Sequence, residues 1–191
     1  MKLSWSHRLF LKVNAQVGKR YWLDACMIFC AKQLIFVLAA TVVVVDVFGY
    51  YAVRIPPAQG RILAWSPFVA VSACIAIVLS WILGFLWKHR RPIVELPEIK
   101  EIVKPLGTWK SFPSDHTILA FIFAFALWFM VGWNEFSAVV SVFGFIAATL
   151  VAMSRVYVGV HYPRDVLGGC IIGAWFGYYF VRIGSAILSF F

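Results

Sequence analysis

The chain has 191 residues, of which 63% are hydrophobic and 13% are charged, and its formal net charge is +9 at pH 7. Soluble domains carry roughly 45–50% apolar and about 25% charged residues, so this composition excludes an ordinary soluble domain and indicates an integral membrane protein. The excess of cations suits anionic lipid headgroups or a phosphorylated substrate, whereas no nucleic-acid partner is expected, because the cations are scattered over short loops.

The sequence predicts an all-α, polytopic membrane helix bundle preceded by a short helix. Residues 1–20 interleave apolar and basic side chains, which is typical of an amphipathic helix that lies at the membrane interface. Five longer apolar stretches follow, and each has the length and composition of a membrane span. They run roughly over residues 22–53, 62–87, 115–133, 136–153 and from 165 to the C-terminus.

The first of these stretches is longer than one crossing requires. Its early part, residues 22–32, is a candidate for a separate half-helix, so a sixth span stays open. Because every backbone polar group must be satisfied inside the lipid, the repeated apolar runs are expected to pack together as helices. We therefore expect one membrane-embedded domain over residues 1–191.

Two polar loops interrupt the apolar pattern. One covers residues 88–116, between the second and third spans, and the other covers residues 154–165, between the fourth and fifth. Counting the crossings places both loops at the same face of the membrane. Two separate loops at one face can converge to build a site.

The loop at 154–165 carries residues suited to phosphate chemistry. His161 and Asp165 are spaced i, i+4, and they share one helix face if Pro163 occupies the first helical turn. The carboxylate can then fix the imidazole tautomer and leave the other ring nitrogen free as a nucleophile, while Arg155 can clamp phosphate oxygens. The alternative is a structural His–Asp pair with an interfacial arginine, and this loop alone leaves both interpretations open.

The loop at 88–116 adds a second histidine and further cations. His116 would supply a proton donor for a leaving group, and Ser114 is either a phosphate ligand or only the N-cap of the next helix. Arg91 precedes Pro92, which restricts its backbone. The alternative for the basic residues 88–91 is contact with lipid headgroups or a topology signal.

Taken in order, three segments resemble the signature motifs of the type 2 phosphatidic acid phosphatase superfamily. Residues 154–165 match Ser-Arg-x-x-x-Gly-x-His-x-x-x-Asp at every defined position. Residues 113–116 read Pro-Ser-Asp-His where the family has Pro-Ser-Gly-His, which is similar to bacterial undecaprenyl pyrophosphate phosphatases of the bacitracin-resistance type. In the first motif Arg91 and Pro92 match, but Gly84 stands at the position of the family lysine.

The resemblance implies a role for each matching residue. His161 would be the nucleophile that forms a phosphohistidine, Asp165 would orient it, and His116 would protonate the leaving group and later activate water. The phosphate-binding residues would be Arg91, Ser114, Asp115 and Arg155, with Lys88 (or Arg90) in place of the lysine missing at Gly84. The family needs no metal and no cofactor.

The expected activity is hydrolysis of undecaprenyl (polyprenyl) diphosphate to the monophosphate, which recycles the cell-wall carrier lipid. Two alternatives remain open: a phosphatase for another lipid phosphate (phosphatidylglycerol phosphate, lipid A or phosphatidate), and a non-catalytic lipid-binding relative. The expected location is the bacterial plasma membrane, and no oligomeric state follows from the sequence. The basic residues 2–20 favour a cytoplasmic N-terminus, and counting the spans then places the site loops on the cytoplasmic side as well. The resemblance implies the opposite orientation, and we expect the site to be extracytoplasmic.

Overall fold

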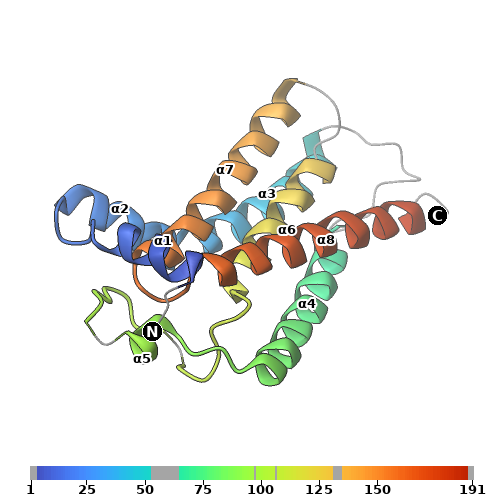
Figure 1. Ribbon diagram of the computed structural model, residues 1–191. Helices are drawn as coiled ribbons and strands as arrows, with labels where there is room; N and C mark the ends of the chain where they lie inside the picture. Colours follow the sequence, from blue (N-terminus) through green and yellow to red (C-terminus); the bar gives the residue numbers. More distant parts are fainter. Residues whose placement is uncertain (1–3, 53–64, 97, 106, 131–134, 189–191) are drawn as a thin grey trace.

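The computed structural model describes residues 4–52, 65–96, 98–105, 107–130 and 135–188, and within these ranges the protein has helices and loops but no β-strand (Figure 1). The helices are α1 (Trp5–Asn14), α2 (Tyr21–Lys32), α3 (Leu34–Ala52), α4 (Ser66–Trp87), α5 (Pro92–Glu95), α6 (Asp115–Met130), α7 (Glu135–Tyr157) and α8 (Pro163–Leu188). The predicted all-α fold is confirmed.

Several helices have the dimensions of a membrane span. The segments Ser66–Glu95, Ala138–Tyr157 and Pro163–Gly184 are long and apolar enough to cross a bilayer, and α2 with α3 passes the same test as a bent pair. α6 has 16 residues, fewer than the roughly 20 that a straight span requires. The predicted membrane bundle is confirmed; of the five spans expected, three helices, or four with the bent pair, pass this test among the described residues. The predicted span ends at 62–64 and 131–133 lie outside the described residues.

The first predicted span is divided into two helices. α2 and α3 meet at Gln33 and are bent by 50° relative to each other, so the separate half-helix expected for residues 22–32 is confirmed. In a continuous α-helix the carbonyl of Ala31 would accept a hydrogen bond from within the helix. Here it accepts one from the Arg155 guanidinium, with 2.9 Å between Nη1 and the oxygen. The break therefore connects the first apolar segment to α7.

The helix boundaries at the loop 154–165 differ in part from the prediction. α7 continues to Tyr157, so Ser154 and Arg155 lie in the helix rather than in a loop. Arg155 in the last turn complements the partial negative charge of a helix C-terminus. α8 begins at Pro163, as expected for a proline in the first turn.

A buried carboxylate fixes the start of α4. Asp46 of α3 accepts hydrogen bonds from the backbone N–H of Ser66, at 2.9 Å, and from its hydroxyl, at 2.5 Å. An acceptor at a helix N-terminus satisfies N–H groups that lack partners within the helix, and its negative charge complements the helix dipole. Helix capping therefore accounts for this ionisable residue within an apolar span.

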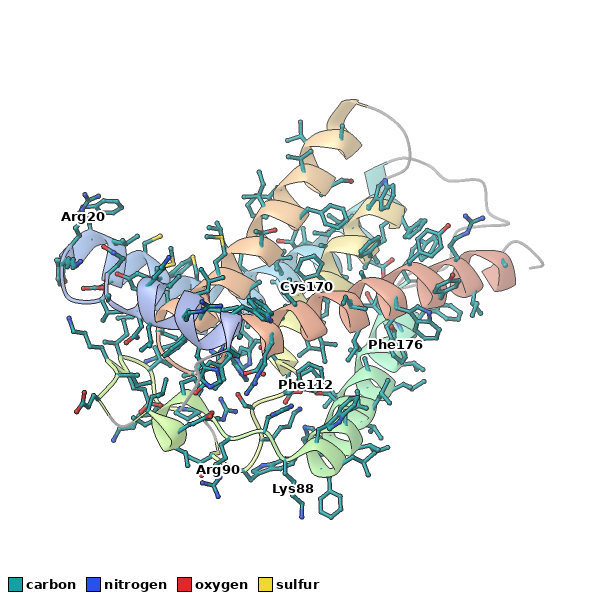
Figure 2. The ribbon with its side chains drawn as sticks, in the orientation of Figure 1. Arg20, Lys88, Arg90, Phe112, Cys170 and Phe176 are labelled. Atoms are coloured by element: carbon teal, nitrogen blue, oxygen red, sulfur yellow. The ribbon has the colours of Figure 1, made fainter. Side chains whose placement is uncertain are left out.

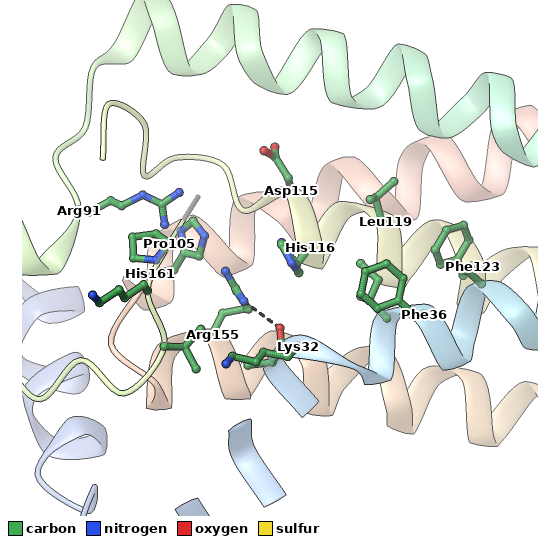
Figure 3. Close-up of a pocket in the computed structure, with 15 residues that line it drawn as sticks. Lys32, Phe36, Arg91, Pro105, Asp115, His116, Leu119, Phe123, Arg155 and His161 are labelled. Carbon is green, nitrogen blue, oxygen red and sulfur yellow. Dashed lines mark hydrogen bonds between the residues drawn. The ribbon is translucent and has the colours of Figure 1, made fainter. Parts of the chain in front are cut away.

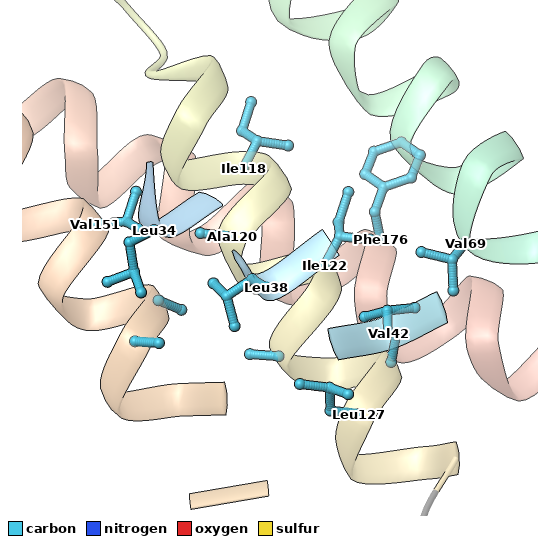
Figure 4. Close-up of a cluster of buried hydrophobic side chains, with 14 of the residues drawn as sticks. Leu34, Leu38, Val42, Val69, Ile118, Ala120, Ile122, Leu127, Val151 and Phe176 are labelled. Atoms are coloured by element: carbon cyan, nitrogen blue, oxygen red, sulfur yellow. The ribbon is translucent and has the colours of Figure 1, made fainter. Parts of the chain in front are cut away.

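α6 lies at the centre of the bundle, where it contacts α3, α4, α7 and α8. Its buried side chains meet apolar side chains from all four helices (Figure 4). The labelled core residues are Leu34, Leu38, Val42, Val69, Ile118, Ala120, Ile122, Leu127, Val151 and Phe176. A helix that is apolar on every face is expected to be buried in this way, and its first turn carries Asp115 and His116.

Three glycines of α8 allow α6 to approach closely. Gly169, Gly173 and Gly177 recur at every fourth position and form a stripe along one face of the helix. A Cβ atom at Gly173 would lie 2.5 Å from the carbonyl oxygen of Ile118, and one at Gly169 would lie 2.9 Å from that of Ser114. Small residues at this spacing permit close helix–helix packing in membrane proteins. The stripe thus brings the first turns of α6 and α8 together.

The substitution Gly173→Ala tests this packing. We expect it to lower the free energy of unfolding by about 1–3 kcal/mol, because the added methyl group overlaps backbone that cannot move independently. Thermal unfolding of the detergent-solubilised protein would measure the change. The control is Ala70→Val, which enlarges an exposed position on α4. An unchanged midpoint for Gly173→Ala would contradict the close approach.

Candidate active site

One cavity of about 550 Å³ collects side chains from both predicted site loops and from α2, α3 and α6 (Figure 3). Four polar side chains converge at one end, namely Arg91, His116, Arg155 and His161. The other end is apolar and lies between α3 and α6, where it is lined by Phe36, Leu119 and Phe123. The cavity therefore joins a cationic end to an apolar end.

His161 and Asp165 lie together at the start of α8. The distance from His161 Nδ1 to Asp165 Oδ2 is 3.8 Å, which is longer than a hydrogen bond. Asp165 Oδ2 instead accepts from the Ser111 hydroxyl at 2.5 Å and from the backbone N–H of Tyr162 at 2.9 Å. These bonds hold the Asp165 carboxylate beside Nδ1 of His161. The other ring nitrogen, Nε2, does not face this carboxylate. Catalytic hydrogen bonds are often long without substrate and shorten when it binds.

The environment of His161 keeps its imidazole neutral. The side chain is 3% exposed, and this burial lowers its pKa to about 4, an effect that Asp165 opposes and that the guanidinium groups of Arg155 and Arg91 reinforce. At pH 7 the ring is therefore unprotonated. A neutral imidazole retains the lone pair that a nucleophile requires.

Two arginines hold their guanidinium groups at the cationic end. Arg91 Nη1 donates to the carbonyl of Val160 at 3.1 Å, next to His161, and Arg155 Nη1 donates to Ala31 as described above. The Nε atoms of Arg91 and Arg155 are buried and have no hydrogen-bond partner. Buried N–H donors normally have acceptors, and phosphate oxygens match the guanidinium fork. These arginines are therefore suited to bind a phosphoryl group.

The motif residues at the start of α6 take different positions. His116 lines the cavity. Ser114 is fully buried and is not among the lining residues; its N–H donates to the carbonyl of Asp165 at 3.1 Å and its hydroxyl accepts from Thr117. Its own carbonyl accepts the first hydrogen bond of α6, from Ile118. The structure therefore places Ser114 as the N-cap of α6 and not at the cavity wall.

Asp115 lines the cavity, but its carboxylate is held by other groups. Asp115 Oδ1 accepts hydrogen bonds from Lys110 Nζ and from the hydroxyl of Ser80 in α4, both at 2.5 Å. In Figure 3 the carboxylate points toward α4 and away from Arg155. Asp115, expected to bind phosphate, thus anchors a lysine and the first turn of α6.

Lys110 is a further buried cation, and it belongs to none of the three motifs. It is 4% exposed, and its aliphatic chain passes over Gly84, where a Cβ atom would lie 2.6 Å from both Cγ and Cδ. Burial lowers the pKa of Lys110, and the hydrogen bond to Asp115 opposes that effect. The space left by the absence of a side chain at Gly84 is therefore filled by a lysine from another segment.

Lys88 and Arg90 lie elsewhere. Both are exposed, and they line a second surface cavity together with His89. Lys88 Nζ lies 5.6 Å from the centroid of the Phe85 ring, and Figure 2 shows Lys88 and Arg90 at the edge of the molecule. The structure does not bring either cation to the cavity that holds His161, and the lysine that lies against Gly84 is Lys110.

α1 connects the two site loops, and no sequence motif indicated this. His7 Nε2 lies 3.2 Å from Glu95 Oε1, and the Tyr162 hydroxyl donates to the other Glu95 oxygen at 3.0 Å. Asn14 donates to the carbonyl of Lys100 at 2.7 Å and accepts from its N–H at 2.9 Å. The predicted N-terminal helix is thus fixed to the loops that carry Arg91 and His161.

This arrangement can bind a phosphoryl group and transfer it. A neutral imidazole, a second histidine and two guanidinium groups meet in one partly enclosed space, where they can supply a nucleophile, a proton donor and donors to an anion. Among the described residues, no three His, Cys, Asp or Glu side chains are grouped so that they could hold a metal ion. The guanidinium groups of Arg91 and Arg155 line this end of the cavity.

Comparison with known proteins agrees with this geometry. The sequence profile of the PAP2 superfamily matches residues 66–188, a range that includes both site loops. The putative undecaprenyl-diphosphatase YbjG of Escherichia coli is 34% identical over 165 residues, covering 86% of this chain and 75% of the relative. Undecaprenyl-diphosphatase BcrC of Bacillus subtilis is 26% identical over 188 residues, covering 97% and 87%.

The fold is also similar to that of a solved structure. The crystal structure of Aquifex aeolicus LpxE superposes with a TM-score of 0.69 at 21% identity and covers 95% of this chain and 97% of that one. The family resemblance inferred from the three motifs is confirmed by these matches.

Lys110→Met tests the role of the buried cation, because it keeps the aliphatic contact with Gly84 and removes the ammonium. We expect phosphate release from lipid phosphates to fall by roughly ten- to a hundredfold, since a charge-assisted hydrogen bond contributes about 1.5–3 kcal/mol. The double variant Gly84→Lys/Lys110→Ala returns an ammonium to the same space, and we expect it to recover most of the lost activity.

Lys88→Met is the matched comparison for this experiment, because it removes an exposed ammonium at the C-terminal end of α4, the helix that carries Gly84. We expect it to keep the wild-type rate. A loss of activity in Lys88→Met together with full activity in Lys110→Met would contradict the assignment and return the role to Lys88.

Proposed function

This chain belongs to the PAP2 superfamily, and we propose that it is a membrane lipid phosphatase that hydrolyses undecaprenyl (polyprenyl) diphosphate to the monophosphate. The observation that carries the proposal is the shape of the cavity, whose cationic end holds His161 and whose apolar end runs between α3 and α6. A lipid phosphate has the same division, with a charged headgroup on an apolar chain. The undecaprenyl-diphosphatases among its relatives support this substrate class.

In the first step, the substrate would bind with its terminal phosphoryl group beside His161. The Nε2 lone pair attacks phosphorus, the bond from phosphorus to the bridging oxygen breaks, and that oxygen takes the electron pair. His116, which takes up a proton when the anionic phosphate binds beside it, donates that proton to the departing lipid monophosphate. Asp165 stabilises the positive charge that develops on the His161 ring. The product of this step is a phosphohistidine.

In the second step, water attacks the phosphohistidine. His116, now unprotonated, accepts a proton from the water as the new oxygen–phosphorus bond forms. The bond from phosphorus to Nε2 breaks, the electron pair returns to His161, and inorganic phosphate leaves. His116 is again protonated, so the site is ready for the next lipid.

Electrostatic stabilisation by the arginines accompanies both steps. Charge spreads over the three equatorial oxygens of the transferring group in the transition state. Arg91 and Arg155 are fixed before the reaction by hydrogen bonds to backbone carbonyls. Fixed donors cost little reorganisation when the charge develops. Lys110 balances the charge of Asp115, so this carboxylate does not cancel the positive potential of the two arginines.

The protein is a multi-pass membrane protein, and we propose that its site faces the extracytoplasmic side of the bacterial plasma membrane. A phosphatase that recycles the cell-wall carrier lipid must act where that diphosphate is released, which is the outer face. The basic residues near the N-terminus then lie on the same outer face, where α1 is fixed to the site loops.

The proposed substrate can be tested against the other lipids that the family accepts. The purified protein would be assayed for phosphate release from undecaprenyl diphosphate, phosphatidylglycerol phosphate, lipid A and phosphatidate at equal surface concentration. We expect undecaprenyl diphosphate to give the highest kcat/KM. A higher value for one of the other lipids would reassign the substrate, and no release from any of them would favour a non-catalytic relative.

A further inference from the structure

Two lysines line the cavity but belong to none of the three motifs. Lys32 is the last residue of α2, and Lys104 lies in the loop before α6. Both side chains are exposed, and neither forms a hydrogen bond or an ion pair with any other described residue. In Figure 3 Lys32 lies beside Arg155, at the cationic end. The cavity therefore offers two more cations than a single phosphoryl group needs.

The backbone positions of both lysines are fixed by their neighbours. Ala31 and Val103 are 1% and 6% exposed, and both pack in one cluster with Val158 and Val160 of the loop before His161. The N–H of Ile102 also donates to the carbonyl of Val158 at 3.2 Å. Each lysine thus follows directly after a residue that is anchored against the His161 loop. The two lysines leave the same cluster and border the same cavity.

The charges at the site favour a ligand with more than one phosphate. A phosphate monoester carries about −1.5 to −2 charges at pH 7, which the guanidinium groups of Arg91 and Arg155 can balance. The carboxylate of Asp115 is already paired with Lys110. Lys32 and Lys104 are consequently free to balance the additional negative charge of a second phosphate.

We propose that Lys32 and Lys104 bind the lipid-side phosphate of a diphosphate and determine the preference for diphosphates over monophosphates. This inference rests on the proposed function. When the terminal phosphoryl group moves to His161, the bridging oxygen keeps the bonding electrons, and negative charge grows on the lipid-side phosphate. Two ammonium groups beside that phosphate stabilise the leaving group. A monophosphate substrate has no second phosphate there, so it gains nothing from this contact.

A different role for the same lysines has a different consequence. Lysines at a membrane face commonly contact anionic lipid headgroups. In that role they would change the affinity of the protein for anionic membranes and would affect every substrate equally. The two roles are distinguished by comparing a diphosphate with the matching monophosphate in a detergent without anionic lipid.

The experiment compares Lys32→Met and Lys104→Met with the full-length wild type, using farnesyl diphosphate and farnesyl monophosphate in neutral detergent. We expect each substitution to lower kcat/KM for the diphosphate by about tenfold and to leave that for the monophosphate unchanged. Lys32→Arg and Lys104→Arg should retain the preference because they keep the charge. The control is Lys12→Met, which removes an exposed ammonium of α1 that does not line the cavity.

The outcomes separate this inference from the proposed function. Wild-type hydrolysis of farnesyl diphosphate is measured first, and its absence would overturn both. If the wild type hydrolyses it and both Met variants lose activity equally on the two substrates, or lose none, the lysines do not select diphosphates and the inference is wrong. Thermal unfolding of each variant establishes that it is folded, and both positions are exposed, so the fold is expected to tolerate them.

Discussion

The site depends on the contact between the first turns of α6 and α8. Gly169 and Gly173 allow the two helices to approach until the backbone N–H of Ser114 donates to the carbonyl of Asp165. That contact places His116, in the first turn of α6, in the same cavity as His161, which precedes α8. Residues far apart in the sequence therefore act together because two helix N-termini are packed against each other.

Around this contact the protein gathers positive charge on side chains from several segments. Arg155 is 5% exposed, and its partner is a backbone carbonyl freed by the break between α2 and α3. Burial keeps His161 neutral while the guanidinium groups remain charged, so one end of the cavity combines a positive potential with an unprotonated imidazole. The apolar end between α3 and α6 explains why a membrane-embedded bundle, rather than a soluble domain, would carry this chemistry.

Apolar length and residue spacing predicted much of this arrangement. The positions that they did not predict depend on contacts between segments that are distant in the sequence. Apolar length predicted most of the long helices, and the i, i+4 spacing predicted that His161 and Asp165 lie together. Ser114 matches a motif, but the approach of α8 places it behind the cavity wall. Lys110 could not be recognised as the cation beside Gly84, because only the path of the loop before α6 brings it there. Residue spacing predicts which side chains of one segment lie together. It does not predict which side chains of two distant segments come into contact.

The most direct test of the account is to trap the covalent intermediate. Undecaprenyl diphosphate labelled with ³²P in its terminal phosphoryl group would be mixed with the protein, the reaction stopped within milliseconds under alkaline conditions that preserve phosphohistidine, and the labelled peptide identified by mass spectrometry. The account predicts label on His161 in the wild type and no labelled protein in His161→Ala. Label on another residue, or turnover by His161→Ala with no labelled protein, would contradict it.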